Sequence, residues 1–373
     1  MEFALLTLFL FVNIKGNIGQ GCGCKTFRSC YSDMLQSLTS NDEAQCIKDA
    51  AIGSSTLLIF LKALEHFCGD YISISGDSLT HESRRLYEVT VPKQESENDT
   101  KPVIILEAGQ EAGTSPVGLA LYVLEQLVAC SENDEMIKKI RWVILPCTNP
   151  DGWEYTSFRP NWRKNVKRSD NEVAIGVDIS RNFNYHWDKC KYSKSTFAED
   201  YPGPSAESEK ETVFVQNVIQ KHKNNLMAYI SIRRDGHSLL YPYASSESEE
   251  MDVMAKVAAE IASKVNQRVN GMNIFLNDSI YNVNGKPHCG HSVDYAYNAG
   301  ARLSFEMRVF FESGVRLVNM FQLLPKGNEE SLRSAYYNAI KTLFQIVTNE
   351  KKYNITLEGN QAKLKRNFRQ KYQ

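Results

Sequence analysis

The sequence predicts an α/β fold, a mixed but mostly parallel twisted sheet with helices on both faces. Strand-like and helix-like patterns alternate along most of the 373 residues, which is the order that parallel strands joined by crossover helices require. Residues 102–107 and 140–145 are apolar runs, as expected of strands covered on both faces. An apolar content of 42% is enough for a large core.

Each expected element follows from its own pattern. Alternation of polar and apolar residues predicts a half-buried strand at residues 84–91, and short apolar runs predict the other strands. Apolar residues at helical spacing predict the helices. The remaining strands are expected at residues 102–107, 140–145, 226–232 and 301–307, and the helices at 54–67, 117–130, 207–222, 249–269 and 329–348.

The N-terminal residues predict a secreted protein. Residues 1–12 are nearly all apolar but too few to span a bilayer, and their length fits the hydrophobic region of a signal peptide. A buried N-terminal strand is the alternative. We divide the chain into a signal peptide at residues 1–16, a cysteine-rich segment at 17–70, a main domain at 71–350 and a basic tail at 351–373.

Cysteines and glycosylation sequons agree with an oxidising, extracellular location. The chain has nine cysteines, so at least one thiol is unpaired or intermolecular, and the pairing cannot be read from the sequence. Sequons begin at Asn98, Asn277 and Asn354 and predict glycosylation. The first 68 residues are expected to be stapled by disulfides, because they contain Cys22, Cys24, Cys30, Cys46 and Cys68.

The charge balance argues against nucleic acid or an anionic membrane as a partner. Lys and Arg number 43 and Asp and Glu number 44, which leaves no net field to attract a polyanion. We expect neither a nucleic-acid partner nor a membrane span, and the sequence predicts no oligomeric state.

Two arginines, Arg163 and Arg181, lie among aromatic and short polar residues instead of in a charge run. Arginine held in this way commonly recognises a carboxylate or phosphate through two parallel hydrogen bonds. Structural salt bridges are the alternative. Open α/β sheets bind ligands at the carboxyl ends of their strands. The polar strand ends that can converge on one site are residues 107–115, 147–153, 233–237 and 305–308.

Several motifs together resemble the zinc metallocarboxypeptidase family, of the carboxypeptidase A/B type. They follow that family's order over roughly residues 75–348, so the resemblance implies the family's fold. The motifs are Asn149-Pro-Asp-Gly-Trp-Glu-Tyr155, Trp162-Arg-Lys-Asn165, Gly176-Val-Asp-Ile-Ser-Arg-Asn-Phe183, Tyr201-Pro-Gly-Pro204, Leu239-Leu-Tyr-Pro-Tyr243, Ser279-Ile-Tyr281 and Ser304-Phe-Glu-Met-Arg308.

The resemblance implies a zinc ion held by a His-x-x-Glu pair and a second histidine, with a glutamate, matched by Glu306, as general base. The first pair should lie in residues 107–116, which contain Gln110 and Glu111 but no histidine. The second histidine should directly follow the fourth predicted strand, where this chain has Arg233. All three ligand positions are therefore expected to be lost. No cofactor is predicted, and Arg233 is expected to pair with Glu306 or Glu111.

The substrate-holding residues of the family have matches here. Arg163 matches the arginine that steadies the carbonyl oxygen of the tetrahedral intermediate. Arg181 matches the arginine that clamps the substrate's C-terminal carboxylate, with Ser180 in place of the usual asparagine beside it. Tyr281 matches the tyrosine that closes over the terminal residue. Val293 lies near the position that sets side-chain preference, which implies an apolar pocket.

Two further groups are interpreted as ordinary residues. His288-Cys-Gly-His291 has metal-binding residue types but is expected to be a plain loop. Asp235-Gly-His237-Ser238 has the residue types of a hydrolase triad, on consecutive positions that point apart. We therefore expect a secreted, inactive carboxypeptidase-fold protein that binds peptide or protein C-termini. The alternatives are an active zinc carboxypeptidase that releases apolar C-terminal residues, and a structural or protein-interaction role.

Overall fold

A computed structural model describes residues 26–38, 53–94, 99–168, 176–192, 195–247, 251–268, 274–310, 329–349 and 353. The predicted signal peptide and nearly all of the predicted basic tail lie outside the described residues. Asn98 and Asn354, two of the three predicted glycosylation sites, lie outside them as well, whereas Asn277 is exposed.

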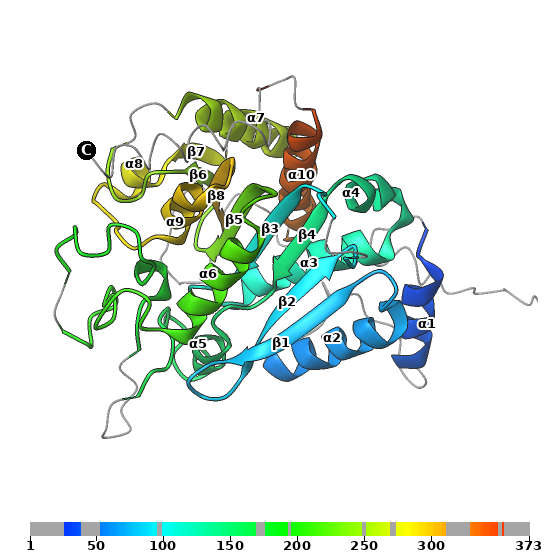
Figure 1. The fold of residues 1–373 in the computed structure, drawn as a ribbon, viewed down its shortest axis with the longest axis horizontal. Coiled ribbons are helices and arrows are strands. Elements are labelled where there is room, and N and C mark those ends of the chain that lie inside the picture. The colour runs from blue at the N-terminus through cyan, green and yellow to red at the C-terminus, as the bar shows by residue number, and fades with distance from the viewer. Residues whose placement is uncertain are drawn as a thin grey trace, which may run out of the picture.

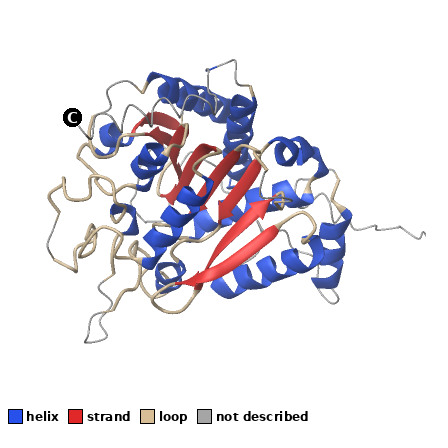
Figure 2. Cartoon of the chain, in the orientation of Figure 1, coloured by secondary structure: helices blue, strands red, loops and turns tan. Residues whose placement is uncertain are grey.

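One eight-stranded sheet forms the centre of the molecule, with the strand order β1-β2-β4-β3-β5-β8-β6-β7 (Figures 1 and 2). The four central strands β4, β3, β5 and β8 run parallel, and so do β6 and β7, while the other three pairings are antiparallel. The predicted mixed, mostly parallel sheet is confirmed. The strands are β1 Ser73–Leu79, β2 Arg85–Val91, β3 Val103–Ala108, β4 Arg141–Leu145, β5 Leu226–Arg234, β6 Ser238–Tyr241, β7 Leu276–Ser279 and β8 Leu303–Val309.

Helices cover both faces of this sheet, as predicted (Figure 1). In β3, Ile104 and Leu106 pack into one apolar cluster and Val103 and Ile105 into another, because successive side chains of a strand point to opposite faces. The larger cluster includes α1 Ser29–Leu38, α2 Ser54–Cys68, α3 Thr114–Ala129, α4 Asp134–Lys139, α7 Asp252–Arg268 and α10 Glu329–Thr348, and the smaller one includes α6 Lys210–His222, α8 Ile280–Asn284 and α9 Ser292–Ala299.

The sequence analysis did not predict several short or polar helices and strands. The edge strand β1 contains Gly76 and Asp77 and has no regular apolar alternation, and β6 and β7 have four residues each. Helices α1, α4, α8, α9 and α5 Pro150–Tyr155 were missed as well, and all of them are short. No helix in the described part of the chain is long and apolar enough to cross a membrane.

The described part of the cysteine-rich segment packs on the main domain. Tyr31 and Met34 of α1 are buried in the larger cluster, beside side chains of the sheet. A disulfide joins Cys30 to Cys68 and so ties α1 to the end of α2. Cys147 is a buried free thiol, in agreement with an odd total of cysteines.

Candidate functional site

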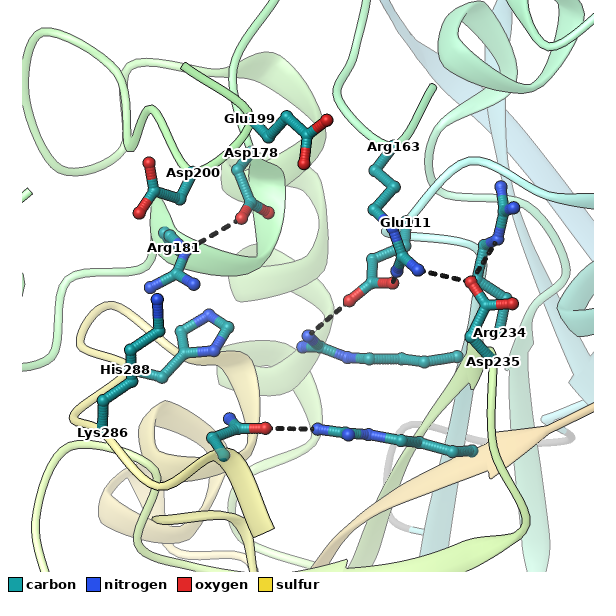
Figure 3. A pocket seen from close by; sticks show the side chains of 13 residues that line it. Glu111, Arg163, Asp178, Arg181, Glu199, Asp200, Arg234, Asp235, Lys286 and His288 are labelled. Carbon is teal, nitrogen blue, oxygen red and sulfur yellow. Dashed lines mark hydrogen bonds and ion pairs between the residues drawn. The ribbon is translucent and has the colours of Figure 1, made fainter. Parts of the chain in front are cut away.

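A cavity of about 600 Å³ lies where β3, β5 and β8 end (Figure 3). The carboxyl ends of these strands converge as expected for an open α/β sheet. Among the residues that the structure describes, the lining is charged or polar throughout and contains no apolar side chain. It consists of Glu111, Arg163, Asp178, Arg181, Glu199, Asp200, Arg233, Arg234, Asp235, Asn284, Lys286, His288 and Arg308.

Arg233 is the second-last residue of β5 and is almost completely buried between two carboxylates. Its Nε lies 3.3 Å from Oε2 of Glu306, and its Nη1 lies 3.6 Å from Oε1 of Glu111. Its Nη2 donates to Oε1 of Gln110 at 3.0 Å and to Oγ of Ser292 at 3.3 Å. The pairing predicted for Arg233 is confirmed, with both carboxylates instead of one.

Glu306, in the middle of β8, is held in the ionised form. Its Oε1 accepts from Nε of Arg308 at 2.5 Å, and its Oε2 accepts from Nε2 of His291 at 2.9 Å. Burial alone raises the pKa of a carboxyl group, but Arg308, Arg233 and His291 together hold the pKa of Glu306 well below its ordinary value. Glu306 therefore remains a buried carboxylate whose oxygens are both engaged by donors.

Gln110 connects this ion pair to a second buried carboxylate, Glu107 at the end of β3. The amide nitrogen of Gln110 donates to Glu107 at 2.8 Å, while its oxygen accepts from Arg233. Hydroxyl groups of Thr148 and Ser231 also donate to Glu107, at 2.5 and 2.7 Å. Burial raises the pKa of Glu107. Gln110 thus acts as a bridge inside a closed hydrogen-bond network, a role that the sequence did not reveal.

Arg163 is neutralised from two sides. Its Nη1 pairs with Glu111 and its Nη2 pairs with Asp235 (Figure 3). Asp235 adopts a left-handed backbone conformation with φ +64°, and it also accepts from Nε of Arg234 at 3.0 Å. The structural salt bridge that the sequence left open for Arg163 is therefore present.

Arg181 lies on the opposite side of the cavity, at the end of the short 3-10 helix Ile179–Arg181. Its Nε donates to Asp178 at 2.9 Å, and its guanidinium lies over the ring of Tyr192 at 5.4 Å. Ser180 is buried and donates to Asp178 at 2.6 Å, so it orients Asp178 and does not face the cavity itself. In Figure 3 the amino group of Lys286 points toward the guanidinium of Arg181. Two cations thus meet in one corner of the cavity.

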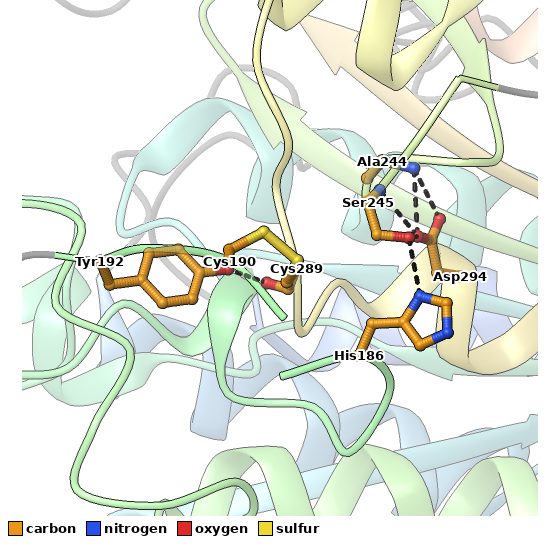
Figure 4. The surroundings of a disulfide bond; sticks show 7 residues. All are labelled: His186, Cys190, Tyr192, Ala244, Ser245, Cys289 and Asp294. Atoms are coloured by element: carbon orange, nitrogen blue, oxygen red, sulfur yellow. Dashed lines mark hydrogen bonds between the residues drawn. A yellow bond between two sulfur atoms is a disulfide. The ribbon is translucent and has the colours of Figure 1, made fainter. Parts of the chain in front are cut away.

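The segment with His288 and His291 is fixed by a disulfide between Cys190 and Cys289 (Figure 4). This bond removes Cys289 as a metal ligand, so the plain-loop interpretation of the segment is supported. Nδ1 of His291 accepts from the backbone nitrogen of Val293 at 3.2 Å, which leaves the proton on Nε2 for Glu306. Burial, with Arg233 nearby, lowers the pKa of His291 to about 4.

Besides Ser180, the predicted substrate-binding residues Tyr281 and Val293 are absent from the cavity lining in the described part of the chain. Tyr281 is half-buried at the second position of α8. Val293 is fully buried in the smaller apolar cluster. The apolar pocket expected from Val293 is therefore not what the cavity provides, because the side chain is buried in the smaller apolar cluster and is not among the lining residues. The roles of Tyr281 and Val293 stay predictions.

The triad-like residues are separated as expected. The carboxylate of Asp235 pairs with Arg163, while Nδ1 of His237 bonds the hydroxyl of Tyr336. Among the functional residues that the sequence analysis did not single out are Arg308 and Lys286. Arg308 lies two residues after Glu306 on one side of a strand, a spacing that could have revealed the pair.

A zinc ion does not fit among these residues as they are arranged. The guanidinium of Arg233 has only donor hydrogens and a fixed positive charge, and it lies within 3.6 Å of both Glu111 and Glu306. A cation placed there would be repelled by the positive charge of Arg233. At the remaining position where the resemblance implies a zinc ligand, the chain offers only the amide of Gln110. The chemistry of this donor set suits anions and hydrogen-bond acceptors.

Comparisons with known proteins agree with the resemblance seen in the sequence. Mast cell carboxypeptidase A from Homo sapiens is 31% identical over 245 residues, which cover 61% of this chain and 56% of the relative. Zinc carboxypeptidase A 1 from Drosophila melanogaster is 30% identical over 295 residues, which cover 73% of this chain and 66% of the relative. The chain thus spans less than two thirds of the length of these curated relatives.

Solved structures share the fold. Carboxypeptidase A from Helicoverpa armigera superposes with a TM-score of 0.71 at 22% identity, over 85% of this chain and 79% of that one. Bovine thrombin-activatable fibrinolysis inhibitor, in complex with tick carboxypeptidase inhibitor, superposes with a TM-score of 0.70 at 21% identity, over 82% of this chain and 100% of that one. The family model described as zinc carboxypeptidase matches residues 58–333, more than half of the chain. The chain therefore belongs to the zinc carboxypeptidase family.

Proposed function

We propose that this chain is a secreted, catalytically inactive member of its family that binds peptide or protein C-termini. The observation that carries the proposal is the buried guanidinium of Arg233 between Glu111 and Glu306. A guanidinium at this position cannot lower the pKa of a bound water molecule and generate hydroxide at neutral pH, as a metal ion does. Two disulfides among the described residues support the extracellular location.

Arg181 and Lys286 are the groups that we expect to hold the terminal carboxylate. Asp178 is paired through Nε of Arg181, and among the described residues no other carboxylate forms an ion pair with this guanidinium. The side chain of Tyr192 also hydrogen-bonds Arg181, and a guanidinium can present two parallel donors to a carboxylate. Arg163 is a weaker candidate, because Glu111 and Asp235 already neutralise it. We expect a polar or charged last side chain, since the lining has no apolar residue.

Fluorescence anisotropy with labelled hexapeptides tests the binding. Peptides with a free C-terminal carboxylate should bind, and the same peptides with a C-terminal amide should not. Arg181→Met should weaken binding by about 2 kcal/mol, roughly thirtyfold, the contribution of a charge-assisted hydrogen-bonded pair. Lys189→Ala, a surface lysine beside Asp188, removes an equal charge outside the cavity and serves as the matched control. Equal binding of the amides, or full binding by Arg181→Met, would contradict the proposal.

An activity assay tests the inactivity. We expect no amino acid to be released from peptides with apolar, basic or acidic C-terminal residues, with or without added zinc. Release that stops when a chelator is added would overturn the inactivity and favour the alternative, an active zinc carboxypeptidase.

A further inference from the structure

A second group of ionisable side chains lies outside the cavity, where the turn between β1 and β2 meets the start of α6. His81 belongs to the turn, Glu209 is the N-cap residue of α6, and Glu211 lies in its first turn. One possible ligand atom from each residue lies within 4.8 Å of the others. In the part of the chain that the structure describes, no other group of three His, Cys, Asp or Glu residues meets this condition.

The amide of Asn165 holds the two carboxylates together. Its Nδ2 donates to Oε2 of Glu209 at 2.7 Å and lies 3.4 Å from Oε2 of Glu211. The orientation of this amide is fixed, because its oxygen accepts from the backbone nitrogen of Val177 at 2.8 Å. Nε2 of His81 lies 3.1 Å from Oε2 of Glu209. The two carboxylates are thus positioned by a rigid partner outside the group, and His81 is held by Glu209.

One carboxylate oxygen in this group has no partner. Oε1 of Glu211 is buried and makes no hydrogen bond, and the residue as a whole is 0% exposed. Leaving a buried carboxylate oxygen unsatisfied is costly, so such an atom needs a specific reason. Burial, together with the charge of Glu209, raises the pKa of Glu211 to about 7. A bound cation would satisfy this oxygen and keep Glu211 ionised.

We propose that His81, Glu209 and Glu211 bind a zinc ion. One imidazole nitrogen and two carboxylate oxygens are ligands that zinc accepts, whereas calcium and magnesium prefer oxygen ligands alone. Ligand atoms about 2.0–2.1 Å from a tetrahedral zinc lie about 3.3 Å from each other, close to the 3.1 Å between His81 and Glu209. Water is the expected fourth ligand.

The surroundings allow a divalent ion to enter and stay. The side chain of His81 is 27% exposed and provides a path from solvent, while both glutamates are buried. Oε1 of Glu209 lies 3.3 Å from Nζ of Lys167 and accepts a hydrogen bond from Oγ of Ser208 at 2.8 Å. Oε2 of Glu209 therefore faces His81. The ion would tie the β1–β2 turn to α6, which makes its role structural and independent of peptide binding.

Zinc titration of tag-free, metal-stripped full-length protein tests the site. Calorimetry should show one equivalent bound at pH 7.5, and a saturating excess should raise the Tm by roughly 5 °C. His81→Gln and Glu211→Gln should each weaken zinc binding at least tenfold and abolish the Tm shift. His186→Gln, which changes a histidine that lies beside Ser245, is the matched control and should bind like the parent protein.

Glu211→Gln also separates metal binding from folding. It removes an unpaired carboxylate oxygen, so the metal-free variant should be at least as thermally stable as the metal-free parent. Zinc binding that survives both His81→Gln and Glu211→Gln, or no zinc binding by the parent, would overturn the site. Loss of zinc in His291→Gln instead of His81→Gln would place the ion in the cavity and overturn it as well. The peptide-binding and release assays are unaffected by any of these outcomes, so the two proposals fail separately.

Discussion

Replacing Arg233 by methionine tests whether its guanidinium compensates the buried carboxylates. Removing one partner of a buried ion pair costs roughly 3–5 kcal/mol, because a charge is left without its partner in the interior. Glu306 would keep Arg308 at 2.5 Å and His291 at 2.9 Å, which places the expected loss at the lower end, about 3 kcal/mol. Glu111 would keep Arg163.

Urea unfolding followed by tryptophan fluorescence, with the disulfides intact, measures this loss. At a slope of about 3 kcal/mol per M, the midpoint should fall by about 1 M. The double variant Arg233→Met/Glu306→Gln removes both charges, so its loss should be about 2 kcal/mol smaller than the sum of the two single losses. Lys189→Ala should stay within about 0.5 kcal/mol of the parent. A loss below about 1 kcal/mol for Arg233→Met, or additive single losses, would refute the compensation.

Three further outcomes are expected. Burial lowers the pKa of His291 to about 4, so on acidification the unfolded chain takes up a proton at His291 before the folded protein does, and the free energy of unfolding should fall by up to about 3 kcal/mol between pH 6.5 and 4. Urea unfolding of His291→Gln at stepped pH should show a shallower fall. A fall as steep as that of the parent protein would exclude His291 as the cause. The Cys190→Ser/Cys289→Ser variant opens a loop with a sequence separation of 99 and should lose about 4–5 kcal/mol by the loop-entropy account, seen as a lower Tm, whereas an unchanged Tm would contradict it. Lys286→Ala should weaken peptide binding three- to tenfold at low salt and less at high salt in the anisotropy assay, and a loss independent of salt would argue against a charge contact.

The sequence predicted the central sheet from local patterns and the pairing of Arg233 from the family resemblance. Apolar runs mark covered strands whatever surrounds them, and a cation beside a buried Glu306 has few possible partners. The partners of Arg163 were not predictable in the same way. Asp235 reaches Arg163 only through a left-handed backbone conformation, which no residue pattern at that turn reveals. For Val293, a match in position gave no information on the direction of its side chain, which is buried in the smaller apolar cluster.

The group of His81, Glu209 and Glu211 shows a further limit of sequence analysis. His81 and Glu209 are 128 positions apart and meet only because β1, β2 and α6 pack together. In the sequence, two glutamates at the start of a helix have an ordinary explanation, since acidic residues stabilise helix N-termini. Only the burial of Glu211 and its unpartnered oxygen distinguish the group from such a helix start.

The proposed inactivity puts a guanidinium where the family resemblance implies a metal, and the charges of the cavity remain balanced. Arg233 places positive charge between the carboxylates of Glu111 and Glu306, and this charge helps to keep Glu306 ionised. A neutral residue at this position would have left Glu306 with fewer compensating charges and favoured its protonation. A guanidinium donates hydrogen bonds but cannot coordinate a carbonyl oxygen as a metal ion does. The corner formed by Arg181 and Lys286 lies on the other side of the cavity from Arg233, so the proposed carboxylate binding does not depend on whether the chain cleaves peptides.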